Sequence, residues 1–297
     1  MLGHTWKWVN AEGKQFWVKF HFKTESGIKN LTQDEADRLK SVDMEYAQRD
    51  LYNHIENGGI AAWKVHVQIM PFEDAWTYRF HPFDVTKIWS HKDYPLIPFG
   101  RMVLNKNPTN YFSEVEQAAF SPSHLVPGVE PSSDKMLQGR LFSYPDTHRH
   151  RLGVNYQQIP INCPYRTKVN TYHRDGLMAV NDNGGSAPNY EPNSFNGPRA
   201  KADAKEAPFE LQGVANRYAY NHPNDDFVQA GTLYRVVYDE AERTRLINNI
   251  VNAMKGVSRE DIKVRAIRNF YLADPEYGTR IAVGLGIDIN KVKNGKF

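Results

Sequence analysis

Alternation of apolar and polar residues marks strands near the beginning of the chain. Residues 15–23 alternate strictly, with one face formed by Phe16, Val18, Phe20 and Phe22 and the other by Trp17, Lys19, His21 and Lys23. A turn-rich stretch, 10–14, lies before them, so residues 4–24 are predicted to form a β-hairpin. Residues 61–70 alternate in the same way and predict a further strand, with one side formed by Trp63, Val65, Val67 and Ile69.

Helical signals separate and follow these strands. Thr32 and Glu35 have the spacing of a capping box, and a helical run over 43–56 ends at Asn-Gly-Gly. Strands, then helices, then strands favour an antiparallel α+β fold or barrel element over β-α-β units. Near the C-terminus, Gly256 is a predicted cap and a second helix is predicted within 259–275. The helix before Gly256 is predicted to bury a stripe of Leu233, Val236, Val237, Ala241, Leu246, Ile250 and Met254.

The middle of the chain has little regular pattern. From about 95 to 225 the periodicity fades, and Pro, Asn and Gly accumulate. The clearest piece, 181–200, is predicted to be a long turn-rich loop. A loop of this length is usually either functional or wrapped over another surface.

Composition narrows the classes of partner. The 37 basic and 34 acidic residues give a formal charge of +3, which is too balanced to indicate a nucleic-acid partner. No apolar run approaches the length of a membrane span, so no membrane partner is expected. Cys163 is the single cysteine, which excludes an internal disulfide and suits a reducing compartment. A cytoplasmic location is therefore expected.

Chemically active side chains follow one face of the helix predicted for 132–153. The helix is predicted to begin at Ser132 or Ser133, with Asp134 in its first turn, and to bend at Pro145. Steps of four and three residues place five side chains in one stripe roughly 22 Å long. The stripe consists of Met136, Arg140, Tyr144, His148 and Arg151.

This stripe suits a large planar tetrapyrrole. Tyr144 would ligate ferric iron as a phenolate, and Arg140, one turn earlier, can donate hydrogen bonds that favour the charged form. Arg151 is placed to pair with carboxylates such as haem propionates, and Met136 to contact a ring face. The same spacing also fits two solvated arginines above a packed tyrosine, so the residues alone leave both interpretations open.

The sequence around Tyr144 resembles a known family signature. "RLFSYPDTH" is similar to the proximal haem-ligand motif of the mono-functional haem catalases, and "GHTWKWVN", "FHFKTESGIKNL" and "DGLMAVNDNGGSAPNYEPNSFNGP" resemble other catalase segments in family order. The resemblance implies that Tyr144 is the axial iron ligand and Arg140 its hydrogen-bond partner. It implies that His4 and Asp134 pair with that arginine. It also implies haem-binding positions at Phe120, Met136, His148 and Arg151, the last as a propionate partner.

Some catalases also carry NADPH, and part of that pattern is present. "KFHFK" contains Lys23, and "IWSHKDY" contains Ile88, Trp89 and His91. The resemblance therefore implies haem as the cofactor and makes NADPH a second candidate. It also implies hydrogen peroxide as substrate and a homotetramer whose wrapping segments interlock.

The resemblance implies an α+β, catalase-like fold in three parts. Residues 1–106 would form half of the antiparallel β-barrel with inserted helices. Residues 107–222 would form a wrapping segment that includes the proximal haem helix, and 223–297 a C-terminal helical domain. Half a barrel is expected to expose strand edges and the face carrying Phe16, Val18, Phe20 and Phe22, and to aggregate unless another chain covers it.

The catalytic base of the family lies outside the matched segments. Catalases use a distal His and Asn upstream of the hairpin, so we expect no distal catalytic residue here, only the supporting Arg140, His4 and Asp134. The chain reads "MLGHT" where the family typically reads Gly-Ser-His-Thr, which puts Gly3 at the serine position. Three functions remain open: a haem catalase present as its C-terminal portion, an inactive haem-binding fragment, and a related enzyme that rearranges fatty-acid hydroperoxides.

Overall fold

The computed structural model of the chain describes residues 3–163, 169, 171–195, 199–200, 202, 205–208 and 226–294. They fall into two compact units. The first contains Met1–Asn30, Val42–Thr77 and Pro82–Val214, and the second contains Leu31–Ser41, Tyr78–His81 and Ala215–Phe297.

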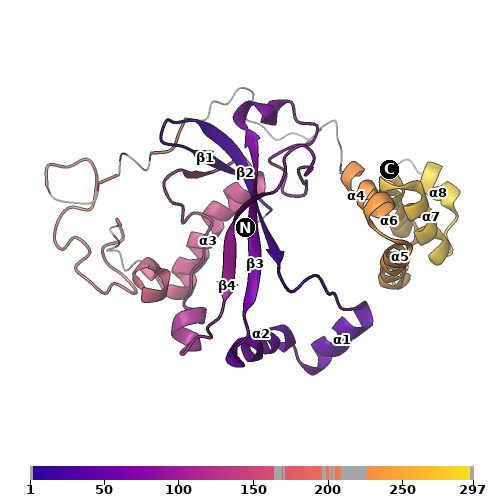
Figure 1. The fold of residues 1–297 in the computed structure, drawn as a ribbon, viewed down its shortest axis with the longest axis horizontal. Coiled ribbons are helices and arrows are strands. Elements are labelled where there is room, and N and C mark those ends of the chain that lie inside the picture. The colour runs from indigo at the N-terminus through magenta and orange to yellow at the C-terminus, as the bar shows by residue number, and fades with distance from the viewer. Residues whose placement is uncertain are drawn as a thin grey trace. The chain divides into compact units, whose positions relative to one another are not determined.

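The first unit is built on an antiparallel sheet of five strands in the order β4-β3-β2-β1-β5. Figure 1 labels β1, β2, β3 and β4 of this sheet. The hairpin joins β1 and β2, with Trp6 opposite Val18. In the pairing of β2 with β3, Lys19 lies opposite Gln68. The predicted α+β fold is thus confirmed. The strand bounds are Trp6–Val9, Gln15–Thr24, Ala61–Pro71, Ile97–Leu104 and Val129–Pro131 for β1 to β5.

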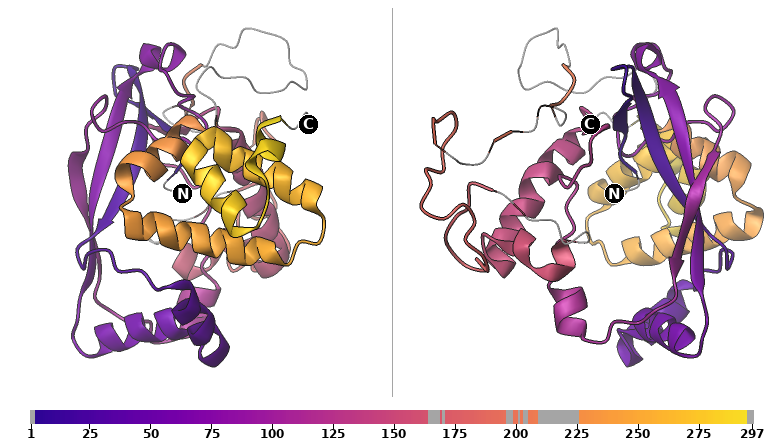
Figure 2. Two further views of the ribbon diagram at one scale, coloured as in Figure 1. Left: turned by 90° about the vertical axis from the view of Figure 1, so that its right-hand side faces the viewer. Right: turned by 60° about the vertical axis from the view of Figure 1, so that its left-hand side comes forward.

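One face of this sheet is covered by α3 (Lys135–Leu152), which lies on one side of it in Figure 2. Leu137, fully buried, packs in one cluster with Trp6, Val18 and Val67. The expected bare face of Phe16, Val18, Phe20 and Phe22 is therefore wrong at its centre, because Val18 is completely buried and the three phenylalanines are half-buried.

The other face is covered by the segment after β3. Trp17 stacks on Phe72, with ring centroids 5.0 Å apart, and meets Phe83 edge-on at 4.6 Å. Phe72 begins the short helix Phe72–Trp76. Lys19 and Gln68 are buried on this face beside Trp17, so β2 lies between two packed layers rather than facing solvent.

The sequence pattern missed the edge strand β4. It lacks clean alternation because Pro98, Phe99 and Gly100 interrupt it, and a bulge leaves Phe99 without a directly opposed residue in β3. The extra residue lets the Phe99 ring reach Trp8 and Phe20, with centroids 5.8 and 6.0 Å away. Every residue of β4 is exposed.

The exposed edge leads to a prediction about solubility. Val103→Lys places a charge on β4 at a residue that is 37% exposed, so folding is expected to change by less than about 0.5 kcal/mol. Charge on an edge strand opposes pairing with another chain, so light scattering on heating should fall. Ala62→Lys, opposite it on β3 but only 8% exposed, is the contrasting variant and should unfold the sheet. Unchanged scattering for Val103→Lys would show that β4 does not drive association.

Two helices lie between β2 and β3. The capping box before α1 (Gln33–Val42) is confirmed, since Thr32 N donates to Glu35 and Glu35 N donates to the Thr32 hydroxyl. α2 spans Tyr46–Glu56 and ends at the predicted Asn-Gly-Gly, where Gly58 has a φ of 82°. Gly58 thereby reverses the chain into β3.

The second unit contains a small helical core. Its elements after residue 226 are α4 (Val228–Thr232), a π-helical turn (Leu233–Val237), α5 (Glu240–Lys255), α6 (Glu260–Ala273), α7 (Pro275–Gly284) and α8 (Ile289–Asn294). The predicted single stripe is wrong at its start, because Val236 and Val237 are 73% and 64% exposed. A capping box of Asp239 and Glu242 begins a new helix. The apolar residues before and after Asp239 therefore do not lie on one continuous helix face. The core is instead formed around Tyr234, Ile247, Val251, Ile267, Ile281 and Ala282.

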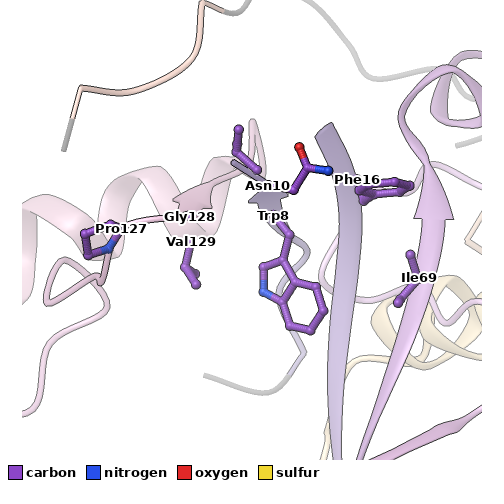
Figure 3. Close-up of a pocket in the computed structure, with 8 residues that line it drawn as sticks. Trp8, Asn10, Phe16, Ile69, Pro127, Gly128 and Val129 are labelled. Atoms are coloured by element: carbon purple, nitrogen blue, oxygen red, sulfur yellow. The ribbon is translucent and has the colours of Figure 1, made fainter. Parts of the chain in front are cut away.

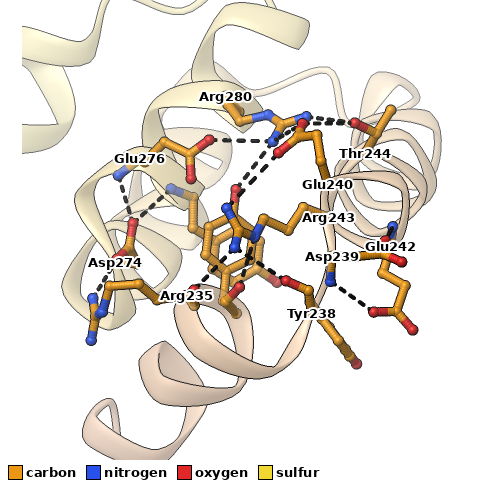
Figure 4. A network of polar contacts seen from close by, with 12 residues as sticks. Arg235, Tyr238, Asp239, Glu240, Glu242, Arg243, Thr244, Asp274, Glu276 and Arg280 are labelled. Carbon is orange, nitrogen blue, oxygen red and sulfur yellow. Dashed lines mark hydrogen bonds and ion pairs between the residues drawn. The ribbon is translucent and has the colours of Figure 1, made fainter.

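A polar network holds this helical core together (Figure 4). Tyr234 stacks on Tyr277 with centroids 4.5 Å apart, and the Arg243 guanidinium lies over the Tyr234 ring, 5.5 Å from its centroid. Arg280 bridges helices by ion pairs to Glu240 at 2.9 Å and Glu276 at 3.2 Å. Burial raises the pKa of Tyr277 to about 12, with a further contribution from Tyr234.

This pKa shift predicts a loss of stability at high pH. The folded unit keeps the Tyr277 proton up to about pH 12, whereas an unfolded tyrosine releases it near pH 10. The free energy of unfolding should therefore fall from pH 10 to pH 12. Tyr277→Phe should reduce this fall, measured by urea unfolding followed by circular dichroism. Tyr271→Phe, in α6 but outside the stacked pair, should keep the slope; equal slopes in wild type and Tyr277→Phe would contradict the assignment.

The predicted loop 181–200 has turns and bends over its described residues, which exclude 196–198. Within the described part of the chain, no helix has both the length and the apolar character needed to cross a bilayer.

Candidate functional site

The site is organised by α3, which carries the predicted stripe of side chains. Its N-cap is Asp134, not Ser132 or Ser133 as predicted. One carboxylate oxygen of Asp134 accepts from the backbone of Met136 at 2.9 Å and of Leu137 at 3.1 Å. The Ser132 hydroxyl donates instead to the Thr5 carbonyl at 2.5 Å. The helix continues through Pro145, and the bend expected there stays a prediction.

A chain of hydrogen bonds leads from Asp134 to Tyr144. His4 Nδ1 lies 2.7 Å from the second carboxylate oxygen of Asp134, and His4 Nε2 lies 2.9 Å from Arg140. Because a guanidinium only donates, His4 Nε2 must accept, and the proton is on Nδ1, where it is donated to Asp134. The other Arg140 nitrogen donates to the Tyr144 hydroxyl oxygen at 2.9 Å. We call Asp134, His4, Arg140 and Tyr144 the proximal relay.

The relay is buried at one end and open at the other. Asp134 and His4 are 2% and 3% exposed, whereas Arg140 and Tyr144 are half-buried. Arg140 lies over the Tyr144 ring at 4.8 Å, which fixes the phenol orientation. Among the described residues, the one hydrogen bond made by the Tyr144 oxygen is to Arg140. Its remaining lone pair and proton are therefore available to a ligand.

A second set of contacts holds the other end of the stripe. His148 is buried, its ring 6.2 Å from that of Tyr144 and 5.5 Å from that of Tyr156. His148 Nε2 donates to the Phe120 carbonyl at 2.9 Å, and its Nδ1 accepts from Arg151 at 3.3 Å. Arg151 also donates to the carbonyls of Glu116 and Ala118. Tyr156 was not found from the sequence, where nothing distinguished it from other core tyrosines.

The residues around Tyr144 fit a large planar cofactor. Phe120 and Met136 are 77% and 57% exposed, which is unusual for large apolar side chains beside a polar site. A haem lying on Tyr144 would cover such residues and meet an oxygen already supported by a guanidinium. A tyrosine oxygen is one of the axial ligands by which proteins hold haem iron. Arg151 has N–H groups that its backbone contacts do not use, and these could meet a propionate. Its pairing with a propionate stays a prediction.

The residues suggested for NADPH are only partly arranged for a ligand. Lys23, Ile88 and His91 are exposed, but Trp89 is 1% exposed and packs under the Lys19 ammonium. Next to His91 lies His21, whose ring centroid is 6.0 Å away. Burial lowers the pKa of His21, and its bond to Gln68 partly offsets this. NADPH binding stays a prediction.

Two cavities in the described part of the chain do not have Tyr144 in their lining. One, of about 430 Å³, has mostly apolar walls formed by strands β1, β2, β3 and β5 and by the loop directly before β5 (Figure 3). The other, of about 940 Å³, lies beside Phe120 and includes His124. Burial lowers the pKa of His124, with a smaller effect from His148.

Comparison with known proteins identifies the family. Residues 1–197 match the family model described as Catalase. The chain belongs to the catalase family. Residues 220–285 match a second model, described as Catalase-related immune-responsive, which extends the likeness into the helical unit.

Individual relatives agree with this assignment. Catalase-A of Dictyostelium discoideum is 62% identical over 291 residues, and the Catalase of Methanosarcina barkeri is 52% identical over 290. These alignments cover 97% and 98% of this chain but 58% and 57% of the relatives. The chain thus spans less than two thirds of their length.

Solved catalase structures share the fold. A bacterial catalase superimposes with a TM-score of 0.84 at 43% identity, covering 95% of this chain and 58% of that one. Catalase A from Saccharomyces cerevisiae gives 0.81 at 42% identity, covering 95% and 59%. The predicted resemblance to a typical mono-functional catalase is therefore confirmed.

Proposed function

We propose that this chain supplies the proximal side of a haem catalase site, with Tyr144 as the axial iron ligand, and acts in the decomposition of hydrogen peroxide to water and oxygen. The observation that carries the proposal is the proximal relay, in which a buried carboxylate, an imidazole and a guanidinium lead to one phenol oxygen. Membership of the catalase family supports the reaction class.

The relay is suited to hold Tyr144 as a phenolate. Arg140 donates to the phenol oxygen, and a donor that carries positive charge favours the ionised form of its acceptor. His4 accepts from Arg140 and fixes the guanidinium in place, while Asp134 fixes the His4 tautomer. Bound haem would supply the iron that exchanges electrons with peroxide. Phe120, Met136, His148 and Arg151 are proposed to line and orient it.

The first test is binding of haem to the chain, followed by absorbance spectroscopy and an oxygen electrode. A ferric-phenolate spectrum with oxygen release from hydrogen peroxide would support both parts of the proposal. A ferric-phenolate spectrum without oxygen release would support the alternative, a catalytically inactive haem-binding chain whose distal groups are supplied from outside it. Absence of any such spectrum would overturn the ligand assignment.

A third function is tested by changing the substrate. The hydroperoxide-rearranging haem enzymes would convert a fatty-acid hydroperoxide without releasing oxygen, so product analysis with a lipid hydroperoxide distinguishes them. Assembly as a homotetramer stays a prediction, which sedimentation measures on the same sample.

A further inference from the structure

A buried lysine of β2 lies behind the proximal relay. Lys19 is 4% exposed, although a lysine side chain is almost never fully buried unless it is paired. Its Nζ donates to the Lys87 carbonyl at 2.9 Å and to the Gly3 carbonyl at 3.4 Å, and the ammonium lies over the Trp89 ring at 5.3 Å. Gly3 is the residue directly before His4 in the chain.

We propose that Lys19 is a positioning residue of the Tyr144 site, which fixes the main chain at His4 and balances the charge of Asp134. The inference rests on the proposed function, because it assigns a role in supporting the same phenol oxygen. Among the described contacts, Lys19 has no hydrogen bond to Tyr144 or Arg140, so its effect on them passes through His4 and Asp134.

The first step is mechanical. His4 is held on both sides, by Lys19 at the Gly3 carbonyl and by the Thr5 hydroxyl, which donates to the Pro82 carbonyl at 2.5 Å. The Thr5 carbonyl also accepts from Ser132, just before α3. Lys19 joins the Gly3 and Lys87 carbonyls, so it ties the start of β1 to the loop that covers β2.

The second step is electrostatic. His4 donates to Asp134 as a neutral imidazole, so it adds no positive charge beside this carboxylate, which α3 stabilises through the backbone N–H groups of Met136 and Leu137. Asp84, the other carboxylate near Lys19, already pairs with Lys87 at 3.3 Å. The Lys19 charge is attracted to both carboxylates, to Asp134 more than to Asp84, and this attraction partly offsets the effect of burial. Burial nevertheless lowers the pKa of Lys19 to about 8.

The consequence is that Lys19 protects the His4 tautomer with its proton on Nδ1. A positive charge behind Asp134 favours the carboxylate that accepts from His4 Nδ1, and so favours the tautomer whose Nε2 accepts from Arg140. A proton on His4 Nε2 would face the Arg140 N–H groups, and two donors cannot bond to each other. The His4–Arg140 bond would then break, and Arg140 would lose its fixed orientation toward Tyr144.

The test uses the chain labelled with ¹⁵N-histidine and NMR, with the His4 signals assigned by a His4→Gln variant. In Lys19→Met, the His4 ¹⁵N signals should lose the pattern of a protonated Nδ1 and an accepting Nε2. Lys64→Met, an exposed lysine on the neighbouring strand, is the matched control and should keep that pattern. The wild-type pattern in folded Lys19→Met overturns the inference.

If Lys19→Met fails to fold, the wild-type chain provides the test. The charged groups that face Lys19 are Asp84 of the covering loop, Asp134 at the start of α3 and His21 of its own strand. His4 signals should shift together with those of the Lys19 side chain, with a midpoint near pH 8. His4 signals that stay constant while Lys19 titrates overturn the inference.

These measurements need no haem, so the two proposals fail separately. Absence of a ferric-phenolate spectrum in the wild-type chain overturns the proposed function and leaves the His4 result standing. A ferric-phenolate spectrum in the wild-type chain, together with His4 ¹⁵N signals that do not respond to Lys19, overturns only the positioning role of Lys19.

Discussion

Tyr144→Phe is expected to abolish the ferric-phenolate spectrum of the haem-bound chain and any peroxide decomposition that depends on it. The substitution removes one oxygen and leaves the ring beneath Arg140 and beside His148. The phenol oxygen takes part in one described hydrogen bond, so the free energy of unfolding should change by about 1 kcal/mol. Absorbance spectroscopy measures the first effect, and urea unfolding measures the second.

Tyr156→Phe is the matched control for this change. Tyr156 is 2% exposed, and its ring lies 5.5 Å from that of His148, the histidine that also neighbours Tyr144. The control should retain the ferric-phenolate spectrum, because its oxygen is not proposed to meet iron. A spectrum that survives Tyr144→Phe, or that is lost equally in both variants, would contradict the ligand assignment.

Asp134→Ala is expected to have the second large effect, because Asp134 serves both α3 and the relay. Losing the cap of a helix costs about 1 kcal/mol, and leaving the buried His4 Nδ1–H without an acceptor costs about 1–3 kcal/mol more. We therefore expect the free energy of unfolding to fall by about 2–4 kcal/mol, measured by urea unfolding, together with a weaker ferric-phenolate band.

Asp134→Asn separates these two roles. An amide has a single oxygen, so it can cap α3 or accept from His4, but not both. If the oxygen caps the helix, the amide N–H₂ faces His4 and favours the wrong tautomer. The stability loss should then be smaller than for alanine, while the His4 ¹⁵N signals change. An asparagine variant with the wild-type tautomer and spectrum would show that Asp134 acts only as a cap.

Local sequence determined the elements that depend on neighbouring residues. The β1–β2 hairpin, the capping box of Thr32 and Glu35, and the spacing of Arg140 and Tyr144 on one helix all follow from short-range geometry. Motif resemblance added His4 and Asp134 to the site, although they lie 130 residues apart. Periodicity could not have joined them, because it reports only on neighbours along one element.

Other features were decided by packing between distant segments. β4 forms because its backbone pairs with that of β3. A bulge at Phe99 breaks the alternation of apolar and polar residues that would have predicted a strand there. Lys19 is a charged residue of an alternating strand, yet the segment after β3 covers it. The α4–α5 region has a continuous apolar pattern in the sequence. Asp239 nevertheless caps the start of α5 and divides this pattern, and Val236, before the cap, is exposed.

The hairpin, most of the helices and the family signature around Tyr144 thus follow from local patterns, since each is encoded within a few turns or strand residues. Packing between distant segments set which layer covers each sheet face and which carbonyls hold the buried lysine. It also decided that His4 accepts from Arg140 while donating to Asp134. These outcomes depend on desolvation and on hydrogen-bond direction between segments far apart in the chain, which no local pattern records.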